Sequence, residues 1–474
     1  MGALTSRQTK NNIVAKKEKL KSKEIAALGY KDAVLRSMAM LAVGKHYKYT
    51  PKEEKMALLA NLWKDAEAYR QDAVLGPLAL KVLDYQAEVP QYDFVDKDFP
   101  IFGVEQIAQN ALDQMKNAMR LPITKAGALM PDAHHGYGLP IGGVLATENA
   151  IIPYAVGVDI GCRMCMSIFE APSDFLEKER AQLLKSLNLH SRFGRATFED
   201  NKRGDDFFDR PEFGQLSILR RLKDKAYAQI GSSGGGNHFV EWGYLDLETE
   251  RFGLPKGRYL TLLTHSGSRG FGAFLANHYS RLAQKKRQLP KEYAHLSWFN
   301  MEEAEGQEYW MAMNMAGDYA SACHHHIHRR MAEGLGLQPY VRVENHHNFA
   351  WKEVHNGKEL IVHRKGATPA AAGELGVIPG SMTAPAFLVE GKGLAAALDS
   401  ASHGAGRKMS RRQATETFSK AEMKAILKNA GVELIGGGLD ESPDAYKDIE
   451  SVIAAQTDLV NVLGRFYPKL VRME

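Results

Sequence analysis

Histidines in glycine-rich segments are the residues of this chain best suited to chemistry. In Ser402-His403-Gly404-Ala405-Gly406-Arg407, an arginine follows a histidine by four positions. Glycines let a phosphate approach the main chain closely, and arginine binds phosphate through its planar guanidinium. The segment favours His403 as a nucleophile beside an anion-binding Arg407. A glycine-rich turn is the alternative interpretation.

A carboxylate and a thiol stand together in Asp159-Ile160-Gly161-Cys162. The apolar residues 151–158 precede them, and we expect these residues to form a strand that ends where the two side chains emerge. Such a pair suits a borderline-soft divalent metal. Cys162-Arg163-Met164-Cys165 also permits two other interpretations, a buried strand with two thiols or a redox pair.

Three further segments place polar side chains beside apolar runs. They contribute Asn237, His238, Phe239 and Glu241 in the first segment, His265 in the second, and His347 and Asn348 in the third. A tight hairpin does not need the polar groups of the first segment, so we interpret it as functional. His265 alone is equally consistent with a loop histidine hydrogen-bonded to neighbouring hydroxyls. His347 is a candidate ligand, with Asn348 able to orient a bound group.

The run Cys323-His324-His325-His326-Ile327-His328 resembles a metal site at first sight. His324 and His328 are four residues apart and would share one face of a helix, but the HExxH carboxylate is missing. We therefore interpret the run as a solvated or structural helix face.

Pro379-Gly380-Ser381-Met382 offers backbone N–H groups and a hydroxyl that could contact a phosphate or a base, although ordinary turns have the same composition. The chain contains neither the GK[ST] sequence of a P-loop nor the KxDG motif of lysine-dependent ligases. Any nucleotidyl transfer would therefore need a nucleophile other than that lysine.

The surrounding chain divides into two parts. Residues 1–95 carry helical patterns and a lysine-rich start, which predicts a helical, basic N-terminal extension. From 100 to 474, strand-like runs and glycine-rich turns alternate with helical patterns. This predicts a mixed α/β (α+β) domain with central sheets and peripheral helices, and with the motifs in loops at strand ends.

Composition excludes several classes of protein. The chain has 474 residues, 25% of them charged, and no apolar run long enough to span a bilayer, so no membrane partner is expected. Three cysteines cannot form a disulfide framework, and the first residues lack a signal peptide pattern, so we expect a cytoplasmic protein. A net charge of +5 permits an anionic partner without requiring one.

Taken together, the motifs resemble the RtcB family of GTP-dependent RNA ligases. The resemblance covers residues 100–450 and preserves the order of the motifs. It rests on residues 130–134, 156–162, 236–241, 265–270, 364–367, 373–382, 402–407 and 443–448. It implies an RtcB-type fold from residue 100 onward. It also implies an activity that joins RNA 3′-phosphate or 2′,3′-cyclic phosphate ends to 5′-hydroxyl ends.

The resemblance also implies a role for each candidate residue. His403 would be guanylylated by GTP and pass the guanylyl group to the RNA 3′-phosphate, giving an RNA-ppG intermediate. Two Mn²⁺ ions would be bound by Asp159, Cys162, His238, His265 and His347. The guanine nucleotide would contact Asn237, Phe239, Glu241, Asn348, Pro379, Gly380, Ser381, Met382, Ala405, Gly406, Arg407 and Tyr446.

Some positions depart from the family pattern. Ala386 stands where the family has a serine, and the guanine-contacting lysine at the carboxyl terminus has no counterpart, since Lys469 lies too far back and Arg472 is one residue out of register. His135 and Tyr137 also replace the usual residues. These differences suggest a divergent branch acting in RNA repair or tRNA splicing, with residues 1–95 shaping substrate choice. The need for an archease-like activator stays open.

Two other functions compete with ligation. A metal phosphoesterase could open cyclic phosphates with the same metals but without the guanine contacts. A non-catalytic RNA-binding module would need only phosphate-binding groups. The second alternative does not explain the Asp-Cys-His constellation.

Overall fold

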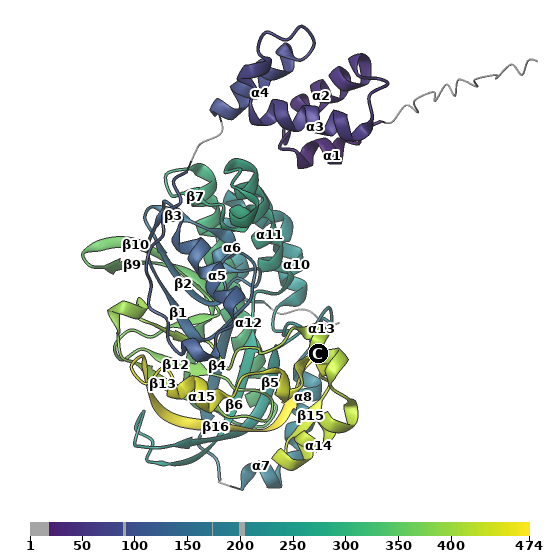
Figure 1. Ribbon diagram of the computed structural model, residues 1–474. Coiled ribbons are helices and arrows are strands. Elements are labelled where there is room, and N and C mark those ends of the chain that lie inside the picture. Colours follow the sequence, from purple (N-terminus) through teal and green to yellow (C-terminus); the bar gives the residue numbers. More distant parts are fainter. Residues whose placement is uncertain (1–18, 89–91, 173, 199–203) are drawn as a thin grey trace, which may run out of the picture. The chain divides into compact units, whose positions relative to one another are not determined.

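The computed structural model describes residues 19–88, 92–172, 174–198 and 204–474 (Figure 1). The described residues fall into two compact units, one within residues 1–91 and the other within residues 92–474. The expected basic segment at residues 1–18 lies outside the described residues. No helix in the described part of the chain is long and apolar enough to cross a membrane.

The regular elements described in the first unit are helices. They are α1 (Ser22–Ala27), α2 (Ala33–His46), α3 (Lys52–Lys64), η1 (Glu67–Tyr69) and α4 (Gly76–Glu88). Asp32 caps α2 by accepting hydrogen bonds from the backbone N–H groups of Val34 and Leu35. The helices enclose their own apolar core, in which the Tyr30 and Trp63 rings lie 4.8 Å apart. This unit therefore buries a core without using residues of the second unit.

The second unit is built on two main sheets. One has the strand order β12-β13-β16-β5-β6-β4-β8, with β15 paired to β16, and the other has the order β1-β2-β10-β9. Two short pairs, β3-β7 and β11-β14, complete the strands. Their bounds are β1 (Thr124–His134), β2 (Ile141–Thr147), β3 (Ala150–Ile151), β4 (Arg163–Phe169), β5 (Phe239–Leu247), β6 (Gly257–Ser266), β7 (Phe299–Asn300), β8 (Pro339–His346), β9 (Asn348–His355), β10 (Lys358–Lys365), β11 (Ala367–Pro369), β12 (Leu375–Ile378), β13 (Ala386–Gly391), β14 (Ser400–Ser402), β15 (Glu433–Ile435) and β16 (Val460–Arg472).

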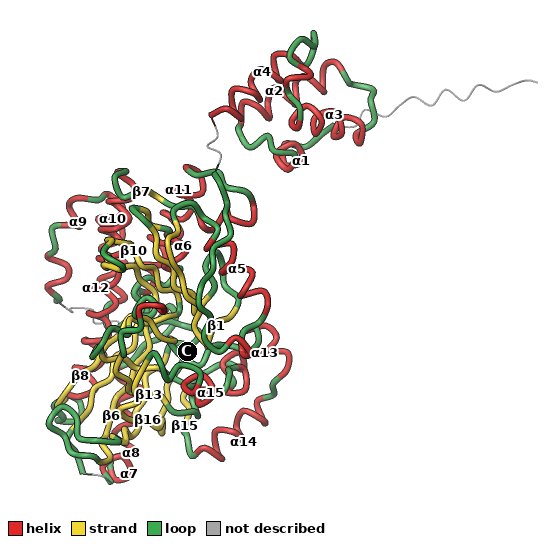
Figure 2. The backbone as a smooth tube through the Cα atoms, turned by 60° about the vertical axis from the view of Figure 1, so that its left-hand side comes forward, coloured by secondary structure: helices red, strands yellow, loops and turns green. Residues whose placement is uncertain are grey.

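Helices lie on both sides of these strands (Figure 2). The α-helices are α5 (Gln109–Met119), α6 (Pro153–Val156), α7 (Phe175–Lys178), α8 (Arg180–His190), α9 (Glu212–Gln215), α10 (Ser217–Gln229), α11 (Arg269–Lys286), α12 (Ala304–Glu333), α13 (Arg411–Thr417), α14 (Lys420–Ala430) and α15 (Ile449–Ala454). The 3-10 turns are η2 (Val104–Gln106), η3 (Asp206–Asp209), η4 (Lys291–Leu296), η5 (Ala395–Ala397), η6 (Leu439–Glu441) and η7 (Pro443–Ala445). The predicted mixed α/β class, with central sheets and peripheral helices, is confirmed.

The end strands of the larger sheet approach each other through one side chain. Asn345 of β8 accepts a hydrogen bond from the Val377 N–H of β12 at 2.9 Å, and its amide donates to the Val377 carbonyl at 3.2 Å. One amide thus makes the pair of bonds that a neighbouring strand would make. The link draws the two ends of the sheet together, in a nearly closed barrel.

The antiparallel order explains where the motifs meet. Because β5, β6, β4 and β8 alternate in direction, the starts of β5 and β4 and the ends of β6 and β8 fall on one edge of the sheet. His238 precedes β5, Cys162 precedes β4, His265 lies near the end of β6, and His347 follows β8. The sheet therefore assembles four candidate metal ligands from distant segments.

The expected strand at residues 151–158 is wrong. Only its first residue lies in β3, and helix α6 follows with Pro153 in its first turn. Proline has no N–H to give to a strand, whereas its fixed φ suits the start of a helix. Asp159 consequently follows a short helix, and Gly157 with φ 99° makes the turn between them.

Candidate active site

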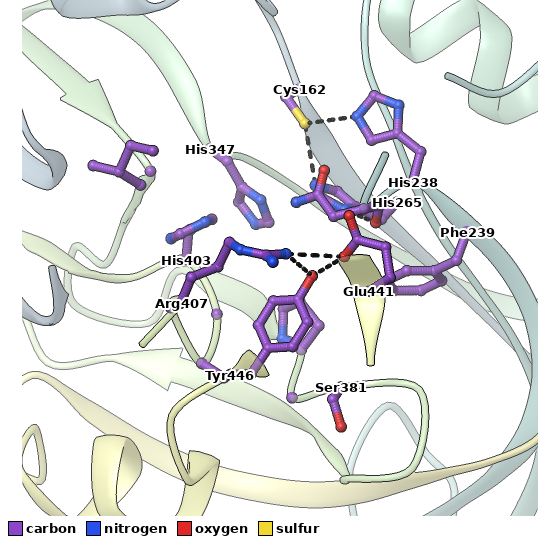
Figure 3. Close-up of a pocket in the computed structure, with 18 of the residues that line it drawn as sticks. Cys162, His238, Phe239, His265, His347, Ser381, His403, Arg407, Glu441 and Tyr446 are labelled. Atoms are coloured by element: carbon purple, nitrogen blue, oxygen red, sulfur yellow. Dashed lines mark hydrogen bonds and ion pairs between the residues drawn. The ribbon is translucent and has the colours of Figure 1, made fainter. Parts of the chain in front are cut away.

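Every residue predicted for the site lines one cavity of about 350 Å³ in the second unit (Figure 3). The cavity includes His403, the five candidate metal ligands and all twelve candidate nucleotide-binding residues. The sequence motifs, separated by up to some 290 positions, therefore converge on a single place.

Cys162, His238 and His265 form the centre of the metal-capable cluster, and all three are buried. The Cys162 Sγ lies 3.1 Å from Nε2 of His265 and 3.5 Å from Nε2 of His238. The Asp159 carboxylate lies 3.0 Å from the same His238 nitrogen. One thiol, one carboxylate and two imidazoles thus surround a common point, a donor set that suits borderline divalent metals.

The histidine tautomers fit a metal centre. The His265 Nδ1–H donates to the Asn237 carbonyl at 3.0 Å, so the lone pair of Nε2 faces Cys162. The buried Nδ1 of His347 has no hydrogen-bond partner among the described residues, as expected of a nitrogen that binds a metal. The His347 ring lies 5.5 Å from the His265 ring and 5.2 Å from the His403 ring, measured between centroids.

The electrostatics of the cluster also fit a cation. Burial lowers the pKa of His265 and His347 well below the usual range, which keeps both rings neutral and able to bind a metal. Burial, and then the Asp159 carboxylate, raise the pKa of the Cys162 thiol. Burial opposes ionisation of Asp159 most strongly, but the hydrogen bonds with His238 and Cys162 and the attraction of His238 and His265 together leave its pKa lowered. A bound cation would stabilise the thiolate that these surroundings otherwise disfavour.

His403 is oriented by a buried aspartate. The His403 Nδ1 lies 2.6 Å from Oδ2 of Asp132, which also accepts the His403 backbone N–H at 3.2 Å. A proton on Nδ1 leaves the Nε2 lone pair free to attack. Gly406 allows this packing, because its φ is 72° and a Cβ there would meet the Asp132 carbonyl oxygen at 2.1 Å. The aspartate thus gives His403 the tautomer and the orientation that a nucleophile needs.

The same cavity carries the candidate guanine contacts. Glu241 is buried, and this burial raises the pKa of its carboxyl well above the usual range. Asn348 stabilises the cavity wall, because its side chain donates to the Asp159 carbonyl at 3.2 Å and accepts from the Gly366 N–H at 2.8 Å. The residues of the turn at 379–382 also line the cavity, and the Pro379 carbonyl accepts the Ala405 N–H at 3.0 Å.

Arg407 already has protein partners. Its guanidinium donates to Glu441 at 3.3 Å, to the Tyr446 hydroxyl at 3.2 Å and to the Asp440 carbonyl at 2.6 Å (Figure 3). Glu441 is buried and also pairs with Arg411. The expected anion-binding arginine is therefore held in place by a carboxylate, with Tyr446 packed beside it.

Several cavity residues were not assigned roles from the sequence. They include His134, Lys365 and Glu441. Asp132, which contacts His403 from outside the cavity lining, was also not assigned a role. Asp132, His134 and Lys365 lie within the family-like segments, which was the one available signal; Glu441 lies just before such a segment. Arg472 does not take the place of the missing lysine: it donates to the Leu187 carbonyl at 2.6 Å, while its strand neighbours Val471 and Met473 line the cavity. The period of two along β16 points Arg472 to the other face.

The fold and the cavity define a class of protein: a mixed α/β chain in which an aspartate-oriented histidine adjoins a buried Asp-Cys-His metal-capable cluster. The family model for "tRNA-splicing ligase RtcB" matches residues 114–210 and 210–474. The chain belongs to the RtcB family.

Curated relatives agree with this assignment. The chain is 34% identical to the RNA-splicing ligase RtcB of Escherichia coli (strain K12) over 389 residues, which cover 75% of this chain and 92% of that protein. It is 28% identical to the tRNA-splicing ligase RtcB of Thermococcus kodakarensis over 463 residues, which cover 81% and 95%. The RNA-splicing ligase RtcB of Mycobacterium bovis is 29% identical over 426 residues, which cover 75% and 98%.

Proposed function

We propose that this chain is a GTP- and Mn²⁺-dependent RNA ligase that joins 3′-phosphate or 2′,3′-cyclic phosphate ends to 5′-hydroxyl ends. The observation that carries the proposal is the place of His403. Its Nδ1 is held by Asp132 at 2.6 Å, and its ring lies beside His347 at the end of the metal-capable cluster. Relatives named as RNA-splicing ligases support RNA as the substrate.

His403 is the nucleophile of the first step. Its Nε2 attacks the α-phosphorus of GTP, a P–N bond forms, the bond to the β-phosphate breaks, and pyrophosphate leaves. An oxygen of the RNA 3′-phosphate then attacks the same phosphorus and releases Nε2, which gives the RNA-ppG end. The 5′-hydroxyl finally attacks the terminal phosphate of the RNA, loses its proton and displaces GMP. A cyclic phosphate is first hydrolysed to the 3′-phosphate.

Guanine selection is assigned to Glu241. An ionised carboxylate accepts both the N1–H and the N2–H of guanine, a pair of donors that adenine lacks. Burial raises the pKa of Glu241, so its charge is costly without such donors, and a bound guanine would stabilise it. Phe239 and Tyr446 line the same cavity and offer ring faces for the nucleotide.

Asp159, Cys162, His238, His265 and His347 are assigned to two Mn²⁺ ions, which would act as Lewis acids on the phosphate oxygens. The chain's own contribution is positional, because the edge of one sheet fixes these side chains before any phosphate arrives. We place the reaction in the cytoplasm and assign the choice of RNA to residues 1–95. An archease-like activator is a further partner to test.

The test uses GTP labelled at the α-phosphate and RNA with defined ends. We expect Mn²⁺-dependent labelling of the chain that disappears in His403→Ala, together with joining of 3′-phosphate to 5′-hydroxyl RNA. Asp205→Asn is a matched control, because Asp205 and His326 form another aspartate–histidine pair at 2.9 Å. If wild type opens cyclic phosphates without joining ends, and His403→Ala does the same, the chain is a phosphoesterase. If RNA binds but neither reaction occurs, the chain is a binding module.

A further inference from the structure

A second cysteine–histidine cluster lies behind the catalytic cavity. Along β4 and β6, successive side chains point to opposite faces of the sheet. His265 faces the cavity, and its neighbour Thr264 therefore faces helix α12. Cys165 lies opposite Thr264 on β6 and opposite Glu344 on β8. Thr264, Cys165 and Glu344 thus form a row across three strands, beneath α12.

Helix α12 adds two imidazoles to this row. His324 and His328 are four residues apart and share one face of the helix. Thr264 Oγ1 lies 2.6 Å from Nδ1 of His324 and 2.8 Å from Nε2 of His328. One nitrogen of each ring and the Cys165 Sγ lie within 4.8 Å of one another, and all three residues are buried. Of the two interpretations of this run, a solvated or a structural helix face, the solvated one is wrong for His324 and His328.

We propose that Cys165, His324 and His328 bind a zinc-class divalent cation, with water as the fourth ligand. Thiolate and imidazole are donors that zinc takes in four-coordinate sites. Glu344 lies opposite Cys165 on β8, but its carboxylate pairs with Arg163 at 2.9 Å and accepts a hydrogen bond from Ser321 at 3.2 Å, so it is not counted among the ligands.

A network of hydrogen bonds is the alternative occupant of this layer. Ser167 lies 2.7 Å from Nδ1 of His328, and His324 Nε2 donates to the Ser266 carbonyl at 3.2 Å. With Thr264 between the rings, every nitrogen of the two histidines then has a partner. This network accounts for the imidazoles. It does not account for the Cys165 thiol, whose Sγ lies within 4.8 Å of one nitrogen of each ring.

The site would fix the elements that hold the catalytic cluster. Thr264 and Ser266 flank His265 on β6, and Cys165 lies three residues beyond Cys162. A cation tying α12 to both strands from behind would hold these ligands in register. The inference concerns metal content and does not depend on GTP or RNA chemistry.

The experiment uses Co²⁺ as a spectroscopic probe in the full chain carrying Cys162→Ser, which removes the thiolate of the catalytic cluster. We expect one Co²⁺ with thiolate-to-cobalt charge-transfer absorption and the intense d–d bands of a tetrahedral site. Adding Cys165→Ser should abolish the charge-transfer band. Adding Cys323→Ser should leave it unchanged, because Cys323 precedes His324 on the same helix but packs in an apolar core. Near-UV circular dichroism checks that each variant is folded.

A second variant tests the same site independently, in case the chain with Cys165→Ser does not fold. His328→Gln in the Cys162→Ser chain keeps the Cys165 thiol and removes one imidazole, so the thiolate-to-cobalt charge-transfer absorption should fall at least tenfold at equal metal concentration. Zinc measured by mass spectrometry should follow the same order among the variants. A folded Cys162→Ser chain without the charge-transfer band would overturn the proposal, as would a band that survives Cys165→Ser.

Discussion

Replacing Asp132 by asparagine should slow guanylylation of His403 without preventing nucleotide binding. Asp132 is completely buried, and one of its oxygens accepts both the imidazole N–H and the backbone N–H of His403. Its other oxygen has no hydrogen-bond partner among the described residues. The carboxylate is charged, because the attraction of His403 and their hydrogen bond outweigh burial and lower the pKa of Asp132.

The size of the effect depends on how the amide turns. If its oxygen faces His403, a charge-assisted hydrogen bond becomes a neutral one, and a loss of roughly 1.5–3 kcal/mol slows the step roughly 10- to 150-fold. If its NH₂ group faces His403, the imidazole proton moves to Nε2 and blocks the attacking lone pair. In the serine protease triad the same substitution costs about 10⁴-fold. We therefore expect the rate of His403 guanylylation to decrease by a factor between roughly 10 and 10⁴.

Single-turnover transfer of label from α-phosphate-labelled GTP measures the guanylylation of His403 directly, and equilibrium binding of GTP measures the affinity for the nucleotide. The dissociation constant of GTP should stay within about threefold, because the Asp132 side chain contacts His403 and Asp132 is not among the residues that line the cavity. Asp205→Asn is the matched control and should label normally. Labelling of Asp132→Asn at the wild-type rate would refute the orienting role, and an equal loss of binding and labelling would point to a collapsed cavity.

Three further predictions follow from the same cavity. Glu241→Gln should weaken GTP binding roughly 10- to 150-fold and leave ATP binding unchanged, because an amide cannot accept both guanine N–H groups. Competition binding measures both affinities. Equal losses of GTP and ATP affinity would contradict the prediction. Dialysis against a chelator should abolish labelling and added Mn²⁺ should restore it, so labelling of a verified metal-free chain would argue against a metal role. Burial lowers the pKa of Lys365 to about 7, so at pH 8 the amine is mostly neutral. A nucleotide phosphate would raise that pKa, so GTP binding should be accompanied by proton uptake. Calorimetry in two buffers of different ionisation enthalpy measures this uptake, and Lys365→Met should reduce it. Identical uptake in both chains would exclude Lys365 as the group that takes up the proton.

The sequence predicted the contents of the cavity better than its internal contacts. Each motif carried glycines and polar groups beside an apolar run, and strand ends on one edge of a sheet bring such groups together. Partners far apart in the chain left no such signal. Asp132 and His403 are separated by 271 positions, and nothing local to either residue shows that their side chains meet. The pairing of Arg407 with Glu441 was missed for the same reason.

Two local errors have definite physical causes. The apolar residues 151–158 resemble a buried strand in composition, but Pro153 starts a helix there. Polarity suggested that the histidines of α12 could face water, but α12 is 30 residues long and packs on β4 and β6 as well as on α11. A long helix enclosed by neighbours buries polar residues that hydrogen-bond or bind a ligand, and hydropathy alone does not reveal those partners.

The two clusters depend on each other through one strand. On β6, His265 faces the catalytic cavity while Thr264 and Ser266 face α12, so a slip of one residue would exchange the two sets. Hydrophobic packing alone specifies this register weakly at the polar end of the strand. The contacts of Thr264 with His324 and His328 oppose the slip from behind, because each is a buried bond that the slipped register would break. Thr264→Val, which keeps the shape but removes the hydroxyl, should therefore lower the affinity of the catalytic cluster for metal although Thr264 is not one of its ligands. Unchanged metal affinity in a folded Thr264→Val chain would show that the register of β6 is held by its other neighbours.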